Sequence, residues 1–345
     1  MGKLRFCRLQ QRQDRFETWR LFVHSSHAAP QPGRPQLVDL RTVLPADLEP
    51  LWAHETCWWR QHLHWDVSAS LAALRRVVGR HGLSGHAVRV DTHTVGYAYY
   101  LVSGNLGVLS SLVLAPAWQS DAAVGPCLLQ ATLATLRRHD VQRVESPCVS
   151  PAYPWLVPVY EQAGFCAARR AFLRMTLAHA PVPSAPPSGI QLAPWQDTHM
   201  PQAATIMQAA YQEMVDTTLN VLYRTVEGCS GVLENLLQQG GCGPLLPEAS
   251  AVARYRDQII GFVIATTIAP HQGHLAQVAV LPAYQGQGVG RLLVSYCAHQ
   301  LARHDFESLS LIVSQANTRA CRLYEAMGLH KILTFPVFVW EQVPG

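Results

Sequence analysis

The stretch Gln285-Gly-Gln-Gly-Val-Gly290 decides the fold of this chain because of the segments on either side of it. The segment before it, residues 274–281, is short and mostly apolar, contains Val278 and Val280 and is followed by Pro282, which is typical of a buried strand. Residues 289–298 after it carry apolar side chains at i, i+3, i+4 and i+7, which predicts a helix. The free amides of the first turn of a helix, together with its dipole, favour an anion. This order of strand, glycine loop and helix therefore predicts a phosphate-binding loop.

Two common kinds of phosphate-binding loop do not fit this sequence. The Walker pattern is excluded because no Lys-Ser or Lys-Thr pair follows the glycines. A dinucleotide-binding loop requires G-x-G-x-x-G and an acidic residue at the end of the next strand. Here the last glycine of Gly286-x-Gly288-x-Gly290 comes one position early, and the next predicted strand, residues 308–313, ends without a carboxylate.

The loop and a second motif downstream resemble the GNAT acetyltransferase superfamily. The pyrophosphate loop of that family reads Gln/Arg-x-x-Gly-x-Gly/Ala, which Gln285, Gly288 and Gly290 match. Residues 317–329 resemble the second family signature, N-x-x-A-x-x-L-Y-x-x-x-G-F, with leucine in place of the final phenylalanine. The resemblance covers roughly residues 188–341. It implies an α/β fold with a central mixed β-sheet flanked by helices.

The resemblance also implies a cosubstrate and an activity. We expect acetyl-CoA, without a metal, and transfer of an acetyl group to a primary amine of a small molecule or a protein. In the family, backbone amides of the loop bind the pyrophosphate, the preceding strand pairs with the pantetheine arm, and the asparagine can also bond this arm. From its position, Asn317 is expected first of all to cap its helix. The cofactor-binding residues implied in this way are Val278, Ala279, Val280, Gln285, Gly286, Gln287, Gly288, Val289, Gly290, Arg291 and Asn317.

Two side chains are candidates for the proton transfers of such a reaction. Tyr324 occupies the position of the family's acid for the leaving thiolate. The alternative is a core tyrosine, because Tyr160 is present at the equivalent position of the first half and packing alone could explain both tyrosines. His274 is the candidate base because it titrates near neutral pH and lies on the strand before the loop. A histidine beside a surface turn is the alternative interpretation. Glu213 and Asp216 are weaker candidates for the base.

An internal repeat divides the chain into two halves. Residues 179–189 form a Pro/Ser-rich linker. Residues 112–119 of the first half align with residues 278–285, and residues 159–165 align with residues 323–329. Matches in the same order and nearly the same register indicate a duplicated domain. We expect two tandem GNAT-like domains.

The first copy departs from the phosphate-binding pattern. Its loop is one residue longer, retains only Gly125, gains Asp121 and has Pro126, which deletes an amide donor. We therefore expect residues 37–178 to be a degenerate GNAT-like domain without a cofactor. Residues 190–345 are then the catalytic domain.

Composition excludes several classes of protein. The 345 residues are 49% hydrophobic and 14% charged, which allows two buried cores. The net charge of +4 comes from residues 1–36, a basic leader that we expect to be poorly ordered. The nearly neutral remainder argues against a nucleic-acid partner. No apolar stretch has the length of a membrane span and no signal peptide opens the chain, so we expect no membrane partner.

The nine scattered cysteines, without CxxC pairs, suggest reduced thiols and a cytoplasmic location. Cys57, His62 and His64 do not have a standard metal-ligand spacing, and the neighbouring tryptophans predict an aromatic packing cluster instead.

Two functions of different classes fit the motifs. The first is an acetyl-CoA-dependent N-acetyltransferase; tandem family members include mycothiol-synthase-like enzymes, which suggests a small amine, with a protein amine as the rival. The second is a non-catalytic acyl-CoA-binding sensor or interaction module. The acceptor and the oligomeric state are left open.

Overall fold

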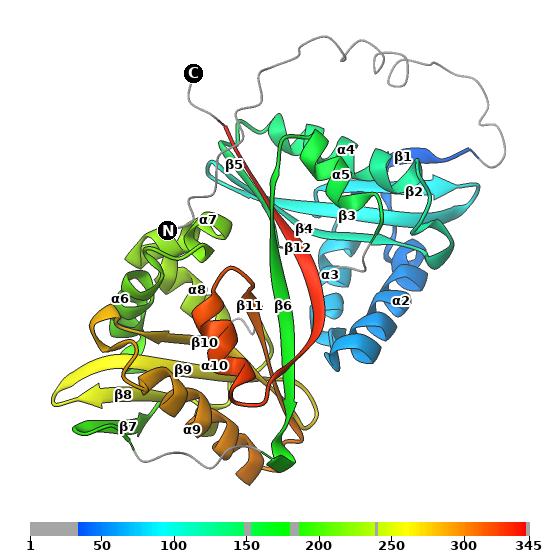
Figure 1. Cartoon of the computed structure of the whole chain (residues 1–345). Helices are drawn as coiled ribbons and strands as arrows, with labels where there is room; N and C mark the ends of the chain where they lie inside the picture. Colours follow the sequence, from blue (N-terminus) through cyan, green and yellow to red (C-terminus); the bar gives the residue numbers. More distant parts are fainter. Residues whose placement is uncertain (1–33, 148–152, 180–185, 239–240, 343–345) are drawn as a thin grey trace.

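The computed structural model describes residues 34–147, 153–179, 186–238 and 241–342. Within these residues, strands from both halves of the chain form one mixed sheet with helices on its faces (Figure 1). The strand order is β1-β2-β3-β4-β5-β12-β6-β11-β10-β9-β8-β7. The predicted mixed-sheet α/β fold is confirmed. The predicted leader and linker lie largely outside the described residues.

The two halves contain the same order of principal elements. The strands of the first half are β1 (Gln36–Asp39), β2 (Gly85–Val90), β3 (His93–Ser103), β4 (Leu106–Leu114), β5 (Arg143–Ser146) and β6 (Cys166–Thr176). Its helices are α2 (Pro45–Leu63), α3 (Ser68–Gly79), α4 (Val124–Arg137) and α5 (Leu156–Gln162). The strands of the second half are β7 (Ile190–Pro194), β8 (Ala251–Tyr255), β9 (Gln258–Ala269), β10 (Gln272–Val280), β11 (Ser308–Ser314) and β12 (His330–Glu341). Its helices are α6 (Met200–Tyr211), α7 (Asp216–Leu219), α8 (Val226–Gln238), α9 (Val289–Arg303) and α10 (Thr318–Glu325), with a short 3₁₀ helix, η6 (Val221–Arg224), before α8.

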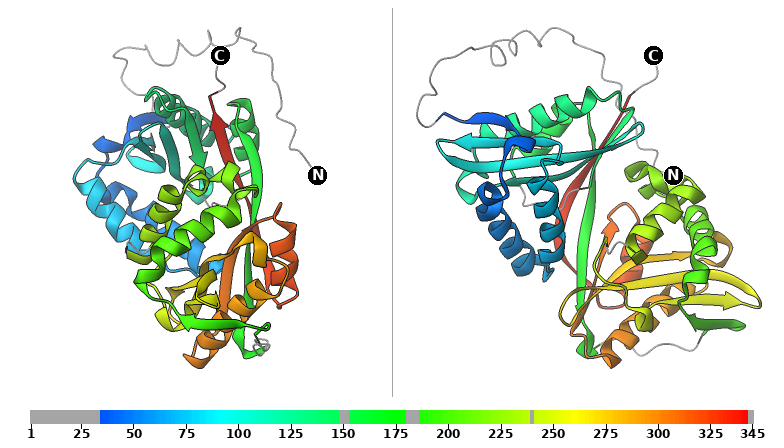
Figure 2. Two further views of the ribbon diagram at one scale, coloured as in Figure 1. Left: turned by 90° about the vertical axis from the view of Figure 1, so that its left-hand side faces the viewer. Right: turned by 180° about the vertical axis from the view of Figure 1, so that it is seen from behind.

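The last strands of the two halves are exchanged. Strand β12 pairs with β5 of the first half, and β6 pairs with β11 of the second half. These two strands also pair with each other and run side by side between the halves (Figure 2). The predicted division into residues 37–178 and 190–345 therefore needs correction, because each half completes its sheet with a strand from the other.

Packing explains why the exchanged strands stay in place. Ala171, Leu173 and Met175 of β6 are buried in the same core as the apolar face of α9. Phe338 of β12 is buried in the core of the first half, where its ring stacks on Tyr160. Apolar burial is the main stabilising contribution in such cores, so neither half has a complete core without the other.

Strands β10 and β11 separate part-way along their length. They pair in parallel only from Gln272 to Leu275 of β10, and a β-bulge follows between Leu275 and Gln277. Beyond the bulge, residues 278–280 pair with β9, and the described strands supply no partner on the β11 side. A bulge of this kind leaves backbone N–H and C=O groups available to a ligand.

Candidate active site

A cavity of about 310 Å³ lies where β10 and β11 separate. Its size is at the lower end of the range of small-molecule sites. Its walls come from the end of α6, the end of β10, the glycine loop and the first turns of α9 and α10. The lining residues are Ala210, Tyr211, Met214, Val278, Ala279, Val280, Gln285, Gly286, Gly288, Gly290, Arg291, Asn317, Arg319, Ala320, Leu323 and Tyr324.

The glycine loop presents the start of α9 to this cavity. Gly286 and Gly288 have φ values of +83° and +85°, in the left-handed region that favours glycine. Gly288 is the N-cap of α9, so the amides of the next three residues have no carbonyl partner within the helix. The described lining residues include the cations Arg291 and Arg319 and no carboxylate. The loop therefore has the donors and the charge that a pyrophosphate requires.

Gln285 holds this arrangement together. Its amide nitrogen donates to the carbonyl of Val280 at 2.9 Å, and its amide oxygen accepts from Arg319 Nη1 at 2.7 Å. Arg319 was missed by the sequence interpretation, where its only signal was a basic residue in the first turn of the predicted helix.

Most of the predicted cofactor-binding residues meet at the cavity, with two exceptions. Gln287 is exposed and donates to the carbonyl of Ala283, and the Val289 side chain is buried in the core. Only the backbone of these two residues could take part. The Asn317 side chain lines the cavity and accepts from the amide of Ala320 at 3.1 Å, so the predicted cap of α10 is confirmed.

Tyr324, the counterpart of Tyr160 of the first half, lines the cavity. Its side chain is 6% exposed, and burial raises the pKa of the phenol, because the charged phenolate is poorly solvated there. The hydroxyl of Tyr160 lies 2.7 Å from Ser146 Oγ. In the second half, the serine at the end of β11, Ser314, donates instead to Asp216 at 2.6 Å. Tyr324 thus stays protonated at neutral pH and faces the cavity.

His274 does not lie at the cavity. It is 3% exposed, its Nδ1 is 2.9 Å from Ser310 Oγ, and its ring centroid is 4.9 Å from that of Trp65 of the first half. Burial lowers the pKa of His274 to about 3. The structure therefore does not support His274 as the base. Position along the strand could not reveal this, because Trp65 comes from the other half of the chain.

The weaker candidates for the base differ in their surroundings. Glu213 is exposed beyond the end of α6. Asp216 is buried, accepts from Ser314 and lies 3.5 Å from Arg170 of β6. Neither lines the cavity, and the described lining residues include no histidine. Tyr211, which does line it, donates to Gln277 at 3.1 Å.

The segment from α7 to η6, which follows the cavity-lining Met214, is tied to the first half. Arg143 of β5 donates to the Thr218 carbonyl at 2.5 Å and pairs with Glu145 at 2.6 Å. Glu145 in turn accepts from the amide of Val221 at 2.8 Å. The first half therefore fixes the backbone beside the cavity. No sequence motif indicated this contact.

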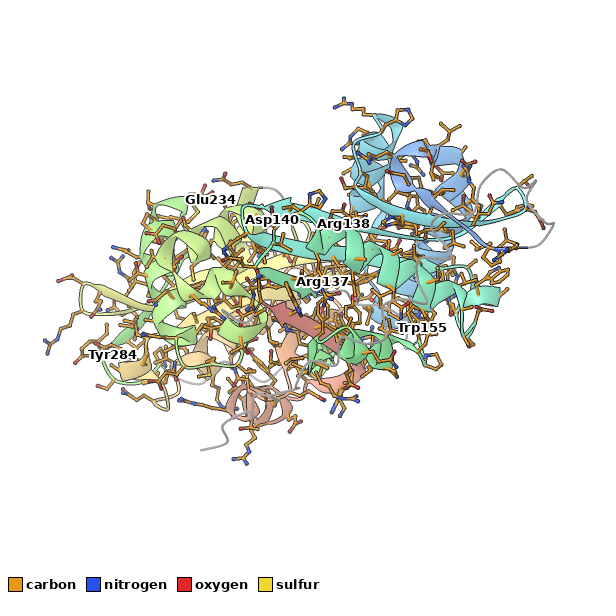
Figure 3. All side chains as sticks on the ribbon, turned by 90° about the horizontal axis from the view of Figure 1, so that it is seen from above. Arg137, Arg138, Asp140, Trp155, Glu234 and Tyr284 are labelled. Atoms are coloured by element: carbon orange, nitrogen blue, oxygen red, sulfur yellow. The ribbon has the colours of Figure 1, made fainter. Side chains whose placement is uncertain are left out.

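The corresponding loop of the first half is occupied by its own side chains. Asp121 accepts from the amides of Ala123 and Val124 at 2.8 and 2.7 Å, at the start of α4. The ring of Trp155 lies against Gly125, where any Cβ would approach it to 2.1 Å. Figure 3 shows Trp155 on the opposite side of the molecule from Tyr284, which precedes the glycine loop of the second half. In the described part of the first half, the start of α4 is thus occupied by the side chains of Asp121 and Trp155.

The predicted aromatic cluster is confirmed: the Trp58, Trp59 and Trp65 rings pack edge to face in sequence, and His62 stacks on Trp58. The described residues contain no group of three side chains able to hold a metal. None of the described helices combines the length and the apolar character needed to cross a membrane.

Comparison with known proteins identifies the family of this region. Residues 235–329 match the profile of the Acetyltransferase (GNAT) family. The [ribosomal protein bS18]-alanine N-acetyltransferases of Haemophilus influenzae and Haemophilus ducreyi are 38% and 36% identical over 76 and 77 residues, each match covering 22% of this chain. The chain spans about half the length of these relatives, 51% and 52%.

Solved structures resemble nearly the whole chain. A GCN5-related N-acetyltransferase from Sphaerobacter thermophilus matches with a TM-score of 0.67 and 18% identity, over 92% of this chain and 98% of its own. A tandem GNAT protein from the clavulanic acid biosynthesis pathway matches with a TM-score of 0.56 and 16% identity, over 90% and 100%. At these identities the likeness shows the fold.

Proposed function

Because residues 235–329 match the GNAT acetyltransferase family, we propose that the second half of this chain binds acetyl-CoA and transfers the acetyl group to a primary amine. The observation that carries the proposal is the composition of one cavity. It brings together a glycine loop at a helix start, an unpaired strand edge and a buried, protonated tyrosine.

Each part of acetyl-CoA has a matching wall. The amides of Val289, Gly290 and Arg291 would bind the pyrophosphate, with charge from Arg291 and Arg319. The pantetheine arm carries amides, which can pair with the open edge at residues 278–280 in the manner of an added strand. This places the thioester toward Tyr211 and Tyr324.

The reaction then proceeds by direct attack. The neutral amine adds to the thioester carbonyl, and the nitrogen of the adduct loses a proton to water. The C–S bond breaks, the leaving thiolate takes a proton from Tyr324, and Tyr324 regains a proton from water. An alkyl amine with a pKa near ~10.4 is mostly protonated at neutral pH. Since the described lining residues offer no carboxylate or histidine, we propose that the amine loses its proton to water before it attacks.

The acceptor is proposed only as a class. The curated relatives act, by name, on the alanine of a ribosomal protein, which favours a protein α-amine, whereas a small amine remains the rival. The proposal also places the protein in the cytoplasm, where acetyl-CoA and thiols in the reduced state coexist.

The test is turnover by the full chain. The protein is incubated with acetyl-CoA and a panel of peptides with alanine or internal lysine, and of small diamines, and the acetylated product is measured by mass spectrometry. We expect product with at least one acceptor. Binding of acetyl-CoA without product from any amine would favour the non-catalytic sensor, and absence of binding would refute both functions.

A further inference from the structure

A second, larger cavity lies between the two halves of the chain. Its volume is about 1040 Å³, and it shares no lining residue with the cavity described above. The first half contributes residues of α2, α3, β3 and β4. The second half contributes Leu237 and Gln238 at the end of α8, Gly241, and residues 243–245 and 267–270 around β9. Its size is that of a site for a small organic molecule.

The walls of this cavity are aromatic and acidic. Trp59, Trp65, Tyr97 and Tyr99 line it together with the carboxylates of Glu55 and Asp66, and the described lining residues include no lysine, arginine or histidine. Asp66 is engaged, because it accepts from both the amide and the hydroxyl of Ser68.

Glu55 is held in a fixed position inside this cavity. One carboxylate oxygen accepts from the hydroxyl of the fully buried Tyr97 at 3.0 Å. Among the described residues, no cationic side chain forms an ion pair with it. A partly buried carboxylate without a cation carries a desolvation cost, and this desolvation raises the pKa of Glu55.

The aromatic groups converge because of secondary-structure spacing. Glu55 and Trp59 are four residues apart on α2 and share a face of the helix. Tyr97 and Tyr99 are two residues apart on β3 and therefore lie on the same face of the strand. Trp65 is packed between Trp59 and His274 of the second half, so this wall is rigid and is completed only when the two halves are joined.

We propose that this cavity between the halves binds a small organic cation, an alkylammonium or quaternary ammonium compound, with Glu55 as its counter-ion. A cation can lie over the electron-rich faces of the aromatic rings and at the same time neutralise the carboxylate. An anion would meet two carboxylates, and a neutral ligand would leave Glu55 without a counter-charge. This proposal does not depend on acetyl transfer in the other cavity.

The test uses isothermal titration of the full chain with choline chloride and with butylammonium chloride. Each cation is compared with a neutral compound of the same shape: choline with 3,3-dimethylbutan-1-ol, and butylammonium with pentane. Pentane is added from an ethanol stock with matched blanks. All titrations are made at the same ionic strength. We expect saturable binding of both cations and at least about tenfold weaker binding of the neutral compounds.

The Glu55→Gln variant removes the charge but can still accept from Tyr97. We expect it to lose at least about tenfold in affinity for choline. Glu49→Gln is the matched control on the same helix, where the exposed Glu49 pairs with Arg75, and it should bind choline as the wild type does.

Three outcomes would overturn the proposal. The first is that neither cation binds saturably, and the second is that choline and its neutral counterpart bind equally well. The third is that Glu55→Gln binds choline with unchanged affinity. That result would place the cation at another site, such as the part of the first cavity that would receive the amine. The comparison of choline with its neutral counterpart needs only the wild type, so it decides the question even if the variant does not fold.

Discussion

Replacing Arg143 by methionine should destabilise the whole protein. Arg143 is 7% exposed and Glu145 is 8% exposed, so the variant leaves a buried carboxylate without its cation. It also removes the donors to the Thr218 carbonyl and to Glu341. Breaking a buried pair in this way costs about 3–5 kcal/mol. Total stabilities of about 5–15 kcal/mol are usual, so this loss is a large fraction.

The assay is urea unfolding of the full chain, followed by tryptophan fluorescence and circular dichroism. The Arg143→Met, Glu145→Gln double variant should recover at least about 1 kcal/mol of the loss, because glutamine still accepts from the amide of Val221 and carries no charge. The control is Arg75→Met, whose pair with Glu49 is 47% and 46% exposed and should be worth less than about 1 kcal/mol. The stabilising role of the buried pair is refuted if Arg143→Met lowers the free energy of unfolding no more than Arg75→Met does. It is also refuted if the double variant loses as much free energy of unfolding as the two single variants added together. Either result would show that the buried pair does not stabilise the contact between the halves.

Four further predictions concern the second half and its cofactor. Tyr324→Phe should lower turnover by about 10²–10⁴-fold while acetyl-CoA affinity, measured by calorimetry, stays the same; unchanged turnover would reduce Tyr324 to a packing role. Gly288→Val should abolish the rise in melting temperature on adding coenzyme A, whereas Gly104→Val, at an open turn with φ +56°, imposes comparable backbone strain and should retain it; a retained rise in Gly288→Val would contradict the loop assignment. Because the pKa of His274 falls to about 3 on folding, the unfolded state binds more protons between about pH 6.5 and 3, and stability falls as pH drops through that window. His274→Asn should remove about 2 kcal/mol of the loss between pH 7 and pH 5, as measured by urea unfolding, and an unaltered slope would show that His274 is not buried in its neutral form. Calorimetry on the full chain should give one acetyl-CoA per chain, since Asp121 occupies the amides of the other loop, and two equivalent sites would refute that interpretation.

The cofactor loop and the caps could be predicted because they are local. The glycines at 286 and 288 and the asparagine at 317 act on amides a few residues away, so their spacing in the sequence carries the geometry. The repeat was visible for the same reason, because both halves keep the same local patterns.

The features that the sequence did not predict all depend on contacts between distant segments. Strand β6 pairs with β11, and β12 pairs with β5. Both strands contain apolar residues of similar kinds, so the sequence of either strand alone does not predict which of these two partners it takes. The environment of His274 depends on Trp65, and the backbone beside the first cavity depends on Arg143, each from the other half of the chain. Tertiary packing decides such pairings.

The exchange of β6 and β12 has a consequence for the order in which the protein can fold during synthesis. In most multidomain chains the N-terminal domain folds before the next one has emerged from the ribosome. Here β5 has only one of its two neighbouring strands, β4, until β12, the last of the described strands to be translated, has appeared. The two halves must therefore reach their native state together. The first half cannot be removed without loss of the second, because it is part of the sheet on which the second half is built.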